Sequence, residues 1–138
     1  MDSFKHGRSA GGLAGGLAAF ANAKLVSGIS YFPDIVKFEN ELKKTDLIIT
    51  AEGRLDARTL TGKGPYGVAG KATRHQIPVI ILAGAVPFTA GKELHHYFNV
   101  ILPIGHAPSS IENAMKNTAA DLERTAFESG NLPALKNR

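Results

Sequence analysis

Residues 46–67 read DLIITAEGRLDARTLTGKGPYG, and this segment indicates the architecture of the whole chain. It opens with Leu47-Ile48-Ile49, which has the length and β-branched content of a buried strand. A charged, glycine-rich loop follows, and Pro65 then suits the first turn of a helix. A buried strand, a loop and a helix start in this order are typical of parallel α/β sheets, which bind ligands at the carboxyl ends of their strands.

Two further apolar segments, residues 78–83 and 99–103, predict additional strands, and the first is apolar enough for burial on both faces. Helical patterns alternate with the strands, at about 65–75, 91–96 and 109–130. Such alternation predicts a parallel sheet with right-handed crossovers. We therefore expect one α/β domain over residues 1–138, a Rossmann-like three-layer α/β/α fold with a small parallel sheet and a flexible tail at 131–138.

The ends of the chain carry further helical patterns. Residues 9–22 predict a helix with one apolar stripe, formed by Leu13, Leu17 and Phe20. Residues 24–29 favour a short extended piece, and 34–44 a modest helix. The last helix should begin at a capping box of Ser109 and Glu112 and end at Gly130.

The first predicted helix also carries glycines one turn apart, which leave a face without side chains: Gly11, Gly12, Gly15 and Gly16. This face suits close packing against a neighbouring strand. It also suits close approach of the backbone to a phosphate group. Both interpretations can hold at opposite ends of the helix.

The bulk composition limits the classes of function. The chain has 138 residues, 43% of them hydrophobic, which is enough for a folded core. Its net charge of +4 comes from scattered basic residues, so a small acidic metabolite fits better than nucleic acid. Zero cysteines fit a reducing cytoplasm. The apolar run near the start resembles a secretory signal, but its glycines make it a poor one, and no window has the length of a membrane span.

The loop after the first strand carries the chemistry. Glu52, Arg54 and Asp56 lie two residues apart, so in extended geometry they share one face. An arginine there can hold a carboxylate or a phosphoryl group, while carboxylates can bind Mg²⁺ or accept a proton from a hydroxyl. Lys63 stands beside a helix start whose free N–H groups attract anions. The alternative is a local ion-pair network that only orders the loop.

Glycines flank this charged loop at Gly53, Gly62 and Gly64, and they would allow a ligand to approach the backbone. Residues 62–67 also satisfy the dinucleotide pattern G-x-G-x-x-G, although no strand runs directly into it. The Walker A pattern is absent because a glycine follows Lys63 where serine or threonine is required. The adjacent histidines His95 and His96 have no third ligand at a suggestive spacing, so we expect them to be surface residues.

The segment TAEGRLDARTLTGKGPYGVA resembles the TGEGR-D…GK-P-GVA signature of bacterial type I glycerate kinases. The resemblance continues through SAGGLAGGLAAF upstream and PVIILAGAV downstream, and DSFK at residues 2–5 is similar to a segment near the family's N-terminus. Ala51 and Arg58 depart from the family's usual glycine and glutamine. Family members are much longer, and the chain resembles only their C-terminal portion.

The resemblance implies transfer of a phosphoryl group from ATP to glycerate with Mg²⁺. It assigns Glu52 and Asp56 to the metal or the substrate hydroxyl, Arg54 to an anion and Lys63 to phosphate. The glycines near phosphate would be Gly11, Gly12, Gly53, Gly62 and Gly64. Two alternatives stay open: a non-catalytic binding or regulatory module, and a dinucleotide-binding module.

Three strands make a small sheet with open edges, so we expect a homodimer that pairs these edges or buries the glycine-rich helix. The competing possibility is a monomer in which residues 24–32 fold back as an extra edge strand.

Overall fold

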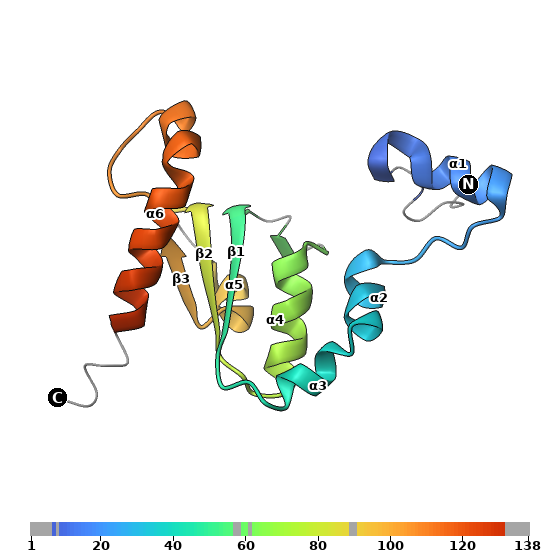
Figure 1. Cartoon of the computed structure of the whole chain (residues 1–138), viewed down its shortest axis with the longest axis horizontal. Coiled ribbons are helices and arrows are strands. Elements are labelled where there is room, and N and C mark those ends of the chain that lie inside the picture. The colour runs from blue at the N-terminus through green and yellow to red at the C-terminus, as the bar shows by residue number, and fades with distance from the viewer. Residues whose placement is uncertain (1–6, 8, 57–58, 61, 89–90, 132–138) are drawn as a thin grey trace. The chain divides into compact units, whose positions relative to one another are not determined.

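The computed structural model describes residues 7, 9–56, 59–60, 62–88 and 91–131. The chain divides into two compact units, Met1–Glu41 and Leu42–Arg138, coloured from blue to red along the sequence in Figure 1. The expectation of a single domain stays a prediction.

The second unit contains a three-stranded sheet in the spatial order β1 (Ile48–Arg54), β2 (Val79–Ala85) and β3 (Val100–Pro103). Both strand pairs are parallel, with Ile48 opposite Val79 and Ile80 opposite Val100. The parallel arrangement predicted from the alternation of strands and helices is confirmed.

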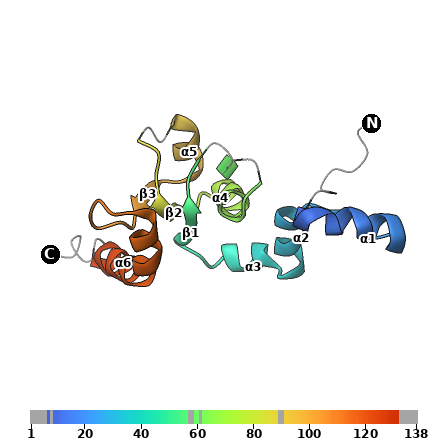
Figure 2. The ribbon, with the colours of Figure 1, turned by 90° about the horizontal axis from the view of Figure 1, so that it is seen from above.

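Three helices cover this sheet. Helices α4 (Gly64–Arg74) and α5 (Lys92–Tyr97) lie on one face, and α6 (Ile111–Asn131) lies on the other (Figure 2). The expected α/β/α layering is therefore present in this unit. None of the helices in the described part of the chain is both long and apolar enough to cross a membrane.

The core of the second unit lies where α4 and α5 meet the sheet. Alternate positions of β2 are fully buried, and Phe98, just after α5, is equally inaccessible. The backbone N–H of Val79 donates to the side-chain oxygen of Asn99 at 2.8 Å, and the Asn99 N–H donates back to Val79 O at 2.9 Å. This exchange aligns the starts of β2 and β3. The largest fully buried side chains are Phe98, Leu55, Ile81, Val79 and Thr59.

Strand β1 is longer than its apolar run predicted. It continues to Arg54, because Glu52 pairs with Ala83 and Arg54 with Ala85 along β2. The expectation that Glu52 and Arg54 lie in a loop is therefore wrong. The ladder hydrogen bonds to β2 override the low strand propensity of the glycine and charged residues.

The first unit begins with a 3₁₀ turn, η1 (Ser9–Gly12), followed by helix α1 (Leu13–Ala21). Gly11 and Gly12 have φ values of +66° and +98°, so they form the turn before the helix. The prediction that they belong to the helix itself is wrong. The expected glycine face is thus reduced to Gly15 and Gly16. Gly15 packs against backbone, since its N–H donates to Gly7 O at 3.0 Å.

Helices α2 (Gly28–Ile35) and α3 (Phe38–Leu42) complete the segment before the sheet, with Leu42 already in the second unit. The predicted helix over 34–44 is interrupted because Lys37 has a left-handed φ of +52°. The predicted edge strand over 24–32 is wrong, and the predicted extended piece over 24–29 is wrong at residues 28–29, which belong to α2. Helical hydrogen bonds start at Ser27, whose carbonyl accepts from Tyr31 N–H at 2.9 Å.

Helix α6 begins one residue later than predicted. Ser110, not Ser109, caps it, because the Asn113 N–H donates to Ser110 Oγ at 3.3 Å. The helix ends at Asn131, one residue beyond the expected Gly130. The predicted tail and the DSFK segment lie outside the described residues, apart from Asn131.

Candidate functional site

Just beyond the carboxyl end of β1, two hydrogen bonds join Asp56 to Thr59. The Asp56 N–H donates to Thr59 Oγ1 at 3.0 Å, and the Thr59 N–H donates to Asp56 O at 3.0 Å. Thr59 is fully buried, so its hydrogen bonds anchor Asp56 to the core. Sequence reasoning missed Thr59, because an isolated threonine in a loop carries no distinctive pattern.

Lys63 brings the predicted acidic residues together. Its ammonium nitrogen lies 3.9 Å from Glu52 Oε1 and 3.8 Å from Asp56 Oδ1. The same nitrogen donates to the backbone carbonyl oxygen of Arg54 at 3.2 Å. These three side chains are about a third exposed, at 32%, 27% and 39% for Lys63, Glu52 and Asp56, so solvent and ligands can reach them.

The predicted glycines occupy two different places. Gly62 has a φ of +106°, which favours glycine, and it turns the chain so that Lys63 precedes α4 directly. Gly64 is the first residue of that helix, and Gly53 lies within β1. Gly11 and Gly12 belong to the other compact unit.

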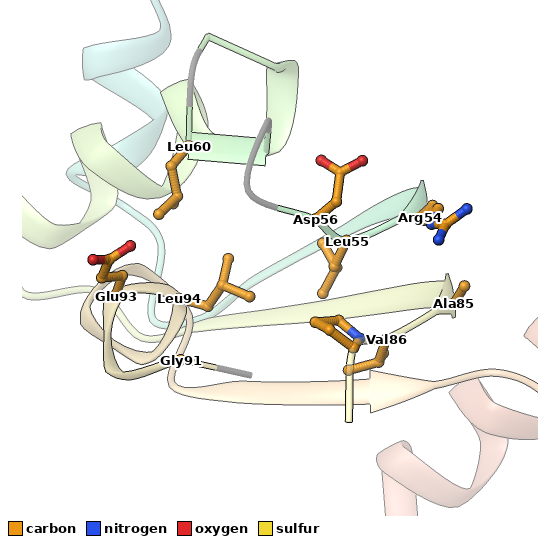
Figure 3. Close-up of a pocket in the computed structure, with 10 residues that line it drawn as sticks. Arg54, Leu55, Asp56, Leu60, Ala85, Val86, Gly91, Glu93 and Leu94 are labelled. Carbon is orange, nitrogen blue, oxygen red and sulfur yellow. The ribbon is translucent and has the colours of Figure 1, made fainter. Parts of the chain in front are cut away.

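Two cavities open at the carboxyl edge of the sheet. The smaller has a volume of about 400 Å³ and lies on the side of α5. Figure 3 shows its lining side chains coming from the end of β1, the end of β2 and α5; among them are Arg54, Leu55, Asp56, Val86, Glu93 and Leu94. The larger, about 560 Å³, lies against α6 and is lined by Glu52, Arg54 and Asp121, among others. Arg54 therefore borders both cavities.

Two tyrosines join the start of α4 to the end of α5. The hydroxyls of Tyr66 and Tyr97 lie 3.3 Å apart, and their rings meet edge to face with centroids 4.8 Å apart. The hydrogen bond with Tyr66 raises the pKa of Tyr97 above its ordinary value, with repulsion between the two phenolates and desolvation adding to the shift. Tyr66 lies in the first turn of α4, the helix that begins directly after Lys63.

A second polar cluster lies at the end of β3. The His106 ring nitrogen Nδ1 contacts Asp121 Oδ1, and the Asp121 side chain is 9% exposed. Sequence reasoning missed this contact, because the partner of His106 is a helix residue fifteen positions away. Within the described residues, no group of three or more His, Asp or Glu side chains could hold a metal ion by itself.

Comparison with known proteins identifies the family of the chain. The family model described as "Glycerate kinase family" matches residues 3–132. A glycerate kinase from Neisseria meningitidis is 37% identical over 126 residues, and one from Bacillus subtilis is 36% identical over 118. These two matches cover 88% and 86% of this chain, respectively. Glycerate 2-kinase from Escherichia coli is 34% identical over 113 residues, covering 79% of the chain.

A crystal structure assigned to glycerate kinase 2 from Salmonella typhimurium LT2 matches with a TM-score of 0.64 and 35% sequence identity. That match covers 96% of this chain but 34% of the other. The chain likewise spans 33% of the Neisseria relative and 31% of the Bacillus one, about a third of their length. Because the family match extends over nearly all of the sequence, the chain belongs to the glycerate kinase family.

Proposed function

We propose that the carboxyl edge of this sheet binds ATP with Mg²⁺ and takes part in transferring the γ-phosphoryl group to a hydroxyl of glycerate. The observation that carries the proposal is the position of Lys63, a cation held between the carboxylates of Glu52 and Asp56 at the start of a helix. Family membership supplies the reaction, and the geometry supplies groups of the required kinds.

The residues present fit a nucleotide-bound Mg²⁺. Two carboxylates already converge on one cation, and Mg²⁺ is commonly held by one or two carboxylates together with substrate phosphates. Glu52 and Asp56 would hold the ion, and Lys63 would turn from them to a phosphate oxygen. The ion would neutralise charge that develops on the transferring group.

Arg54 has a different part in the proposal. Its side chain is exposed and borders both cavities, so it can reach an anion in either of them. A guanidinium can hold the carboxylate of glycerate or the transferring phosphoryl group through paired hydrogen bonds. Gly53, Gly62 and Gly64 would allow phosphate to approach the backbone.

The main alternative is a non-catalytic binding or regulatory module. It is favoured by the length of the chain, about a third of its relatives, since a phosphoryl-transfer site needs groups on both sides of the substrate. We therefore expect weak or absent turnover by the chain alone. A dinucleotide module has less support, because β1 ends at Arg54, well before the Gly62–Gly67 pattern.

A thermal-shift panel separates these possibilities, because a ligand that binds the native state raises its melting temperature. We expect ATP–Mg²⁺ and glycerate each to raise it. A shift with NAD alone would favour the dinucleotide module. The binding proposal fails if neither ATP–Mg²⁺ nor glycerate shifts the transition.

We also propose that the chain forms a homodimer in the cytoplasm. Strand β1 lies at one edge of the sheet. Ile49 in this strand is 60% exposed, and Leu47 just before it is 43% exposed. Pairing of two such edges would cover them. Light scattering at micromolar concentration should give the dimer mass, and a monomer mass would refute the assembly. The lack of cysteines supports the compartment.

A further inference from the structure

The cavity beneath α6 is largely apolar. It lies between the carboxyl ends of the strands and the first half of the helix, with a volume of about 560 Å³. This volume is within the range of pockets that hold small organic ligands, about 300–1,000 Å³. The large side chains of its apolar wall are those of Leu82, Ile104, Ile111, Met115 and Leu122.

One polar side chain in this cavity is held in a fixed position. The Asp121 carboxylate is 9% exposed, lines the cavity and contacts His106 Nδ1 through one of its oxygens. Arg124 in turn donates to the carbonyl oxygen of Ile104 at 2.9 Å, which fastens the segment before His106 to the helix. A carboxylate placed in this way is a pre-oriented hydrogen-bond acceptor for a ligand.

The strand ends leave part of the cavity wall without side chains. Gly53 and Gly105 both line it, and a Cβ atom on either would meet no other atom within 4 Å. The open space at these positions can accept a flat group close to the backbone. Side chains added there would fill the space without a collision in the protein.

Charge determines which ligand fits. Away from Arg54, the carboxylates of Glu52 and Asp121 would repel a small carboxylate such as glycerate, and the apolar wall would give it no partner. A flat, neutral group with amino or hydroxyl donors suits both features, since it packs on the wall and donates to Asp121. Arg54 at the border of the cavity would face phosphates attached to that group.

We propose that this cavity binds the adenosine moiety of ATP, with Asp121 accepting a hydrogen bond from it and the phosphates leading to Arg54 and Lys63. The inference rests on the proposed function and names its nucleotide subsite. The smaller cavity, lined by Arg54 and Asp56, would then receive the phosphoryl acceptor. Arg54 would stand between donor and acceptor.

The test is calorimetric titration with adenosine, ADP–Mg²⁺ and NAD. Met115→Trp fills the cavity from α6, and Phe127→Trp is its control, because both positions are exposed on that helix but only Met115 lines the cavity. We expect wild type to bind adenosine and ADP–Mg²⁺, Met115→Trp to weaken both at least tenfold, and Phe127→Trp to leave both unchanged. Asp121→Asn should weaken adenosine several-fold.

A second pair of variants tests the subsite if Met115→Trp fails to fold. Gly105→Leu fills the cavity from the strand side, and Gly130→Leu places the same side chain in an exposed position on α6. Circular dichroism checks each fold. The expected result is again loss of adenosine binding in Gly105→Leu alone.

The possible failures are distinguishable. Absence of adenosine binding, or binding that is equal in Met115→Trp and wild type, overturns the subsite. If ADP–Mg²⁺ still binds and depends on Lys63 but not on Met115, the proposed function stands and the subsite is wrong. If adenosine and NAD compete for the cavity while ADP–Mg²⁺ does not bind, the subsite is supported and the kinase proposal fails.

Discussion

Gly84 of β2 packs so closely against Gly53 of β1 that a Cβ atom on Gly84 would lie 2.7 Å from the Gly53 carbonyl oxygen. The close approach is at the carboxyl edge of the sheet, between Glu52 and Arg54 in the β1 sequence. Here the two strands still pair, with Glu52 opposite Ala83 and Arg54 opposite Ala85. The two glycines therefore help to position the charged end of β1.

Gly84→Ala should destabilise the fold by about 1–3 kcal/mol, since the added methyl group must push one backbone away from the other. Denaturant unfolding followed by circular dichroism measures the change. Gly53→Ala is the matched control, because its Cβ meets nothing within 4 Å. Equal unfolding midpoints for the two variants would contradict the close packing.

The sequence predicted the strands well where apolar runs mark them, as in residues 78–83, and their parallel order followed from the intervening helices. It placed the end of β1 too early, because Gly53 and Arg54 have low strand propensity and only their pairing with β2 keeps them extended. It likewise continued an extended piece to residue 29, although hydrogen bonding from Ser27 already starts α2 at Gly28.

Lys63→Met should change the free energy of unfolding by less than about 1 kcal/mol. The ion pairs of Lys63 are 3.8–3.9 Å long and partly exposed, and such pairs contribute little to stability. The same substitution should weaken ATP–Mg²⁺ binding strongly, because it removes a phosphate contact. Chemical denaturation gives the first quantity and calorimetry the second. A large loss of stability with unchanged nucleotide affinity would instead support a network that only orders the loop.

Phe98→Ala should destabilise the second unit by about 3–5 kcal/mol, because it leaves a cavity where a fully buried ring now packs. Phe127→Ala removes the same ring from a position on α6 that is 69% exposed, and it should change stability by less than about 0.5 kcal/mol. Urea unfolding curves of the two variants test the location of the core. Similar losses of stability in the two variants would contradict a core centred on Phe98.

Tyr97 should ionise at a higher pH than an unperturbed tyrosine, whose pKa is 10.0, because its neutral hydroxyl is hydrogen-bonded to Tyr66. Tyr66→Phe removes both the hydrogen bond and the repulsion between phenolates, so the pKa of Tyr97 should fall toward the ordinary value. The NMR chemical shifts of the Tyr97 ring carbons during an alkaline titration measure it. An unchanged titration of Tyr97 in the variant would show that the contact does not form in solution.

The candidate site was only partly visible in the sequence. Glu52, Asp56 and Lys63 stand out as charged residues between glycines, and the structure places each of the two carboxylates within 4 Å of the Lys63 ammonium nitrogen. His106 and Asp121 could not be paired in advance, because their contact depends on how α6 returns across the sheet after β3. A contact between side chains of different elements cannot be predicted from the spacing of residues in a single sequence.

Titration calorimetry of ATP–Mg²⁺ into wild type, Lys63→Met and Arg54→Ala tests the proposed nucleotide site most directly. We predict saturable binding of one nucleotide per chain, weakened at least tenfold, or about 1.4 kcal/mol, by each substitution. Omission of Mg²⁺ should weaken wild-type binding as well, because Glu52 and Asp56 would then face the phosphates without the intervening ion. Absence of binding to wild type, or equal affinity in all three proteins, would contradict a nucleotide site at the carboxyl end of β1.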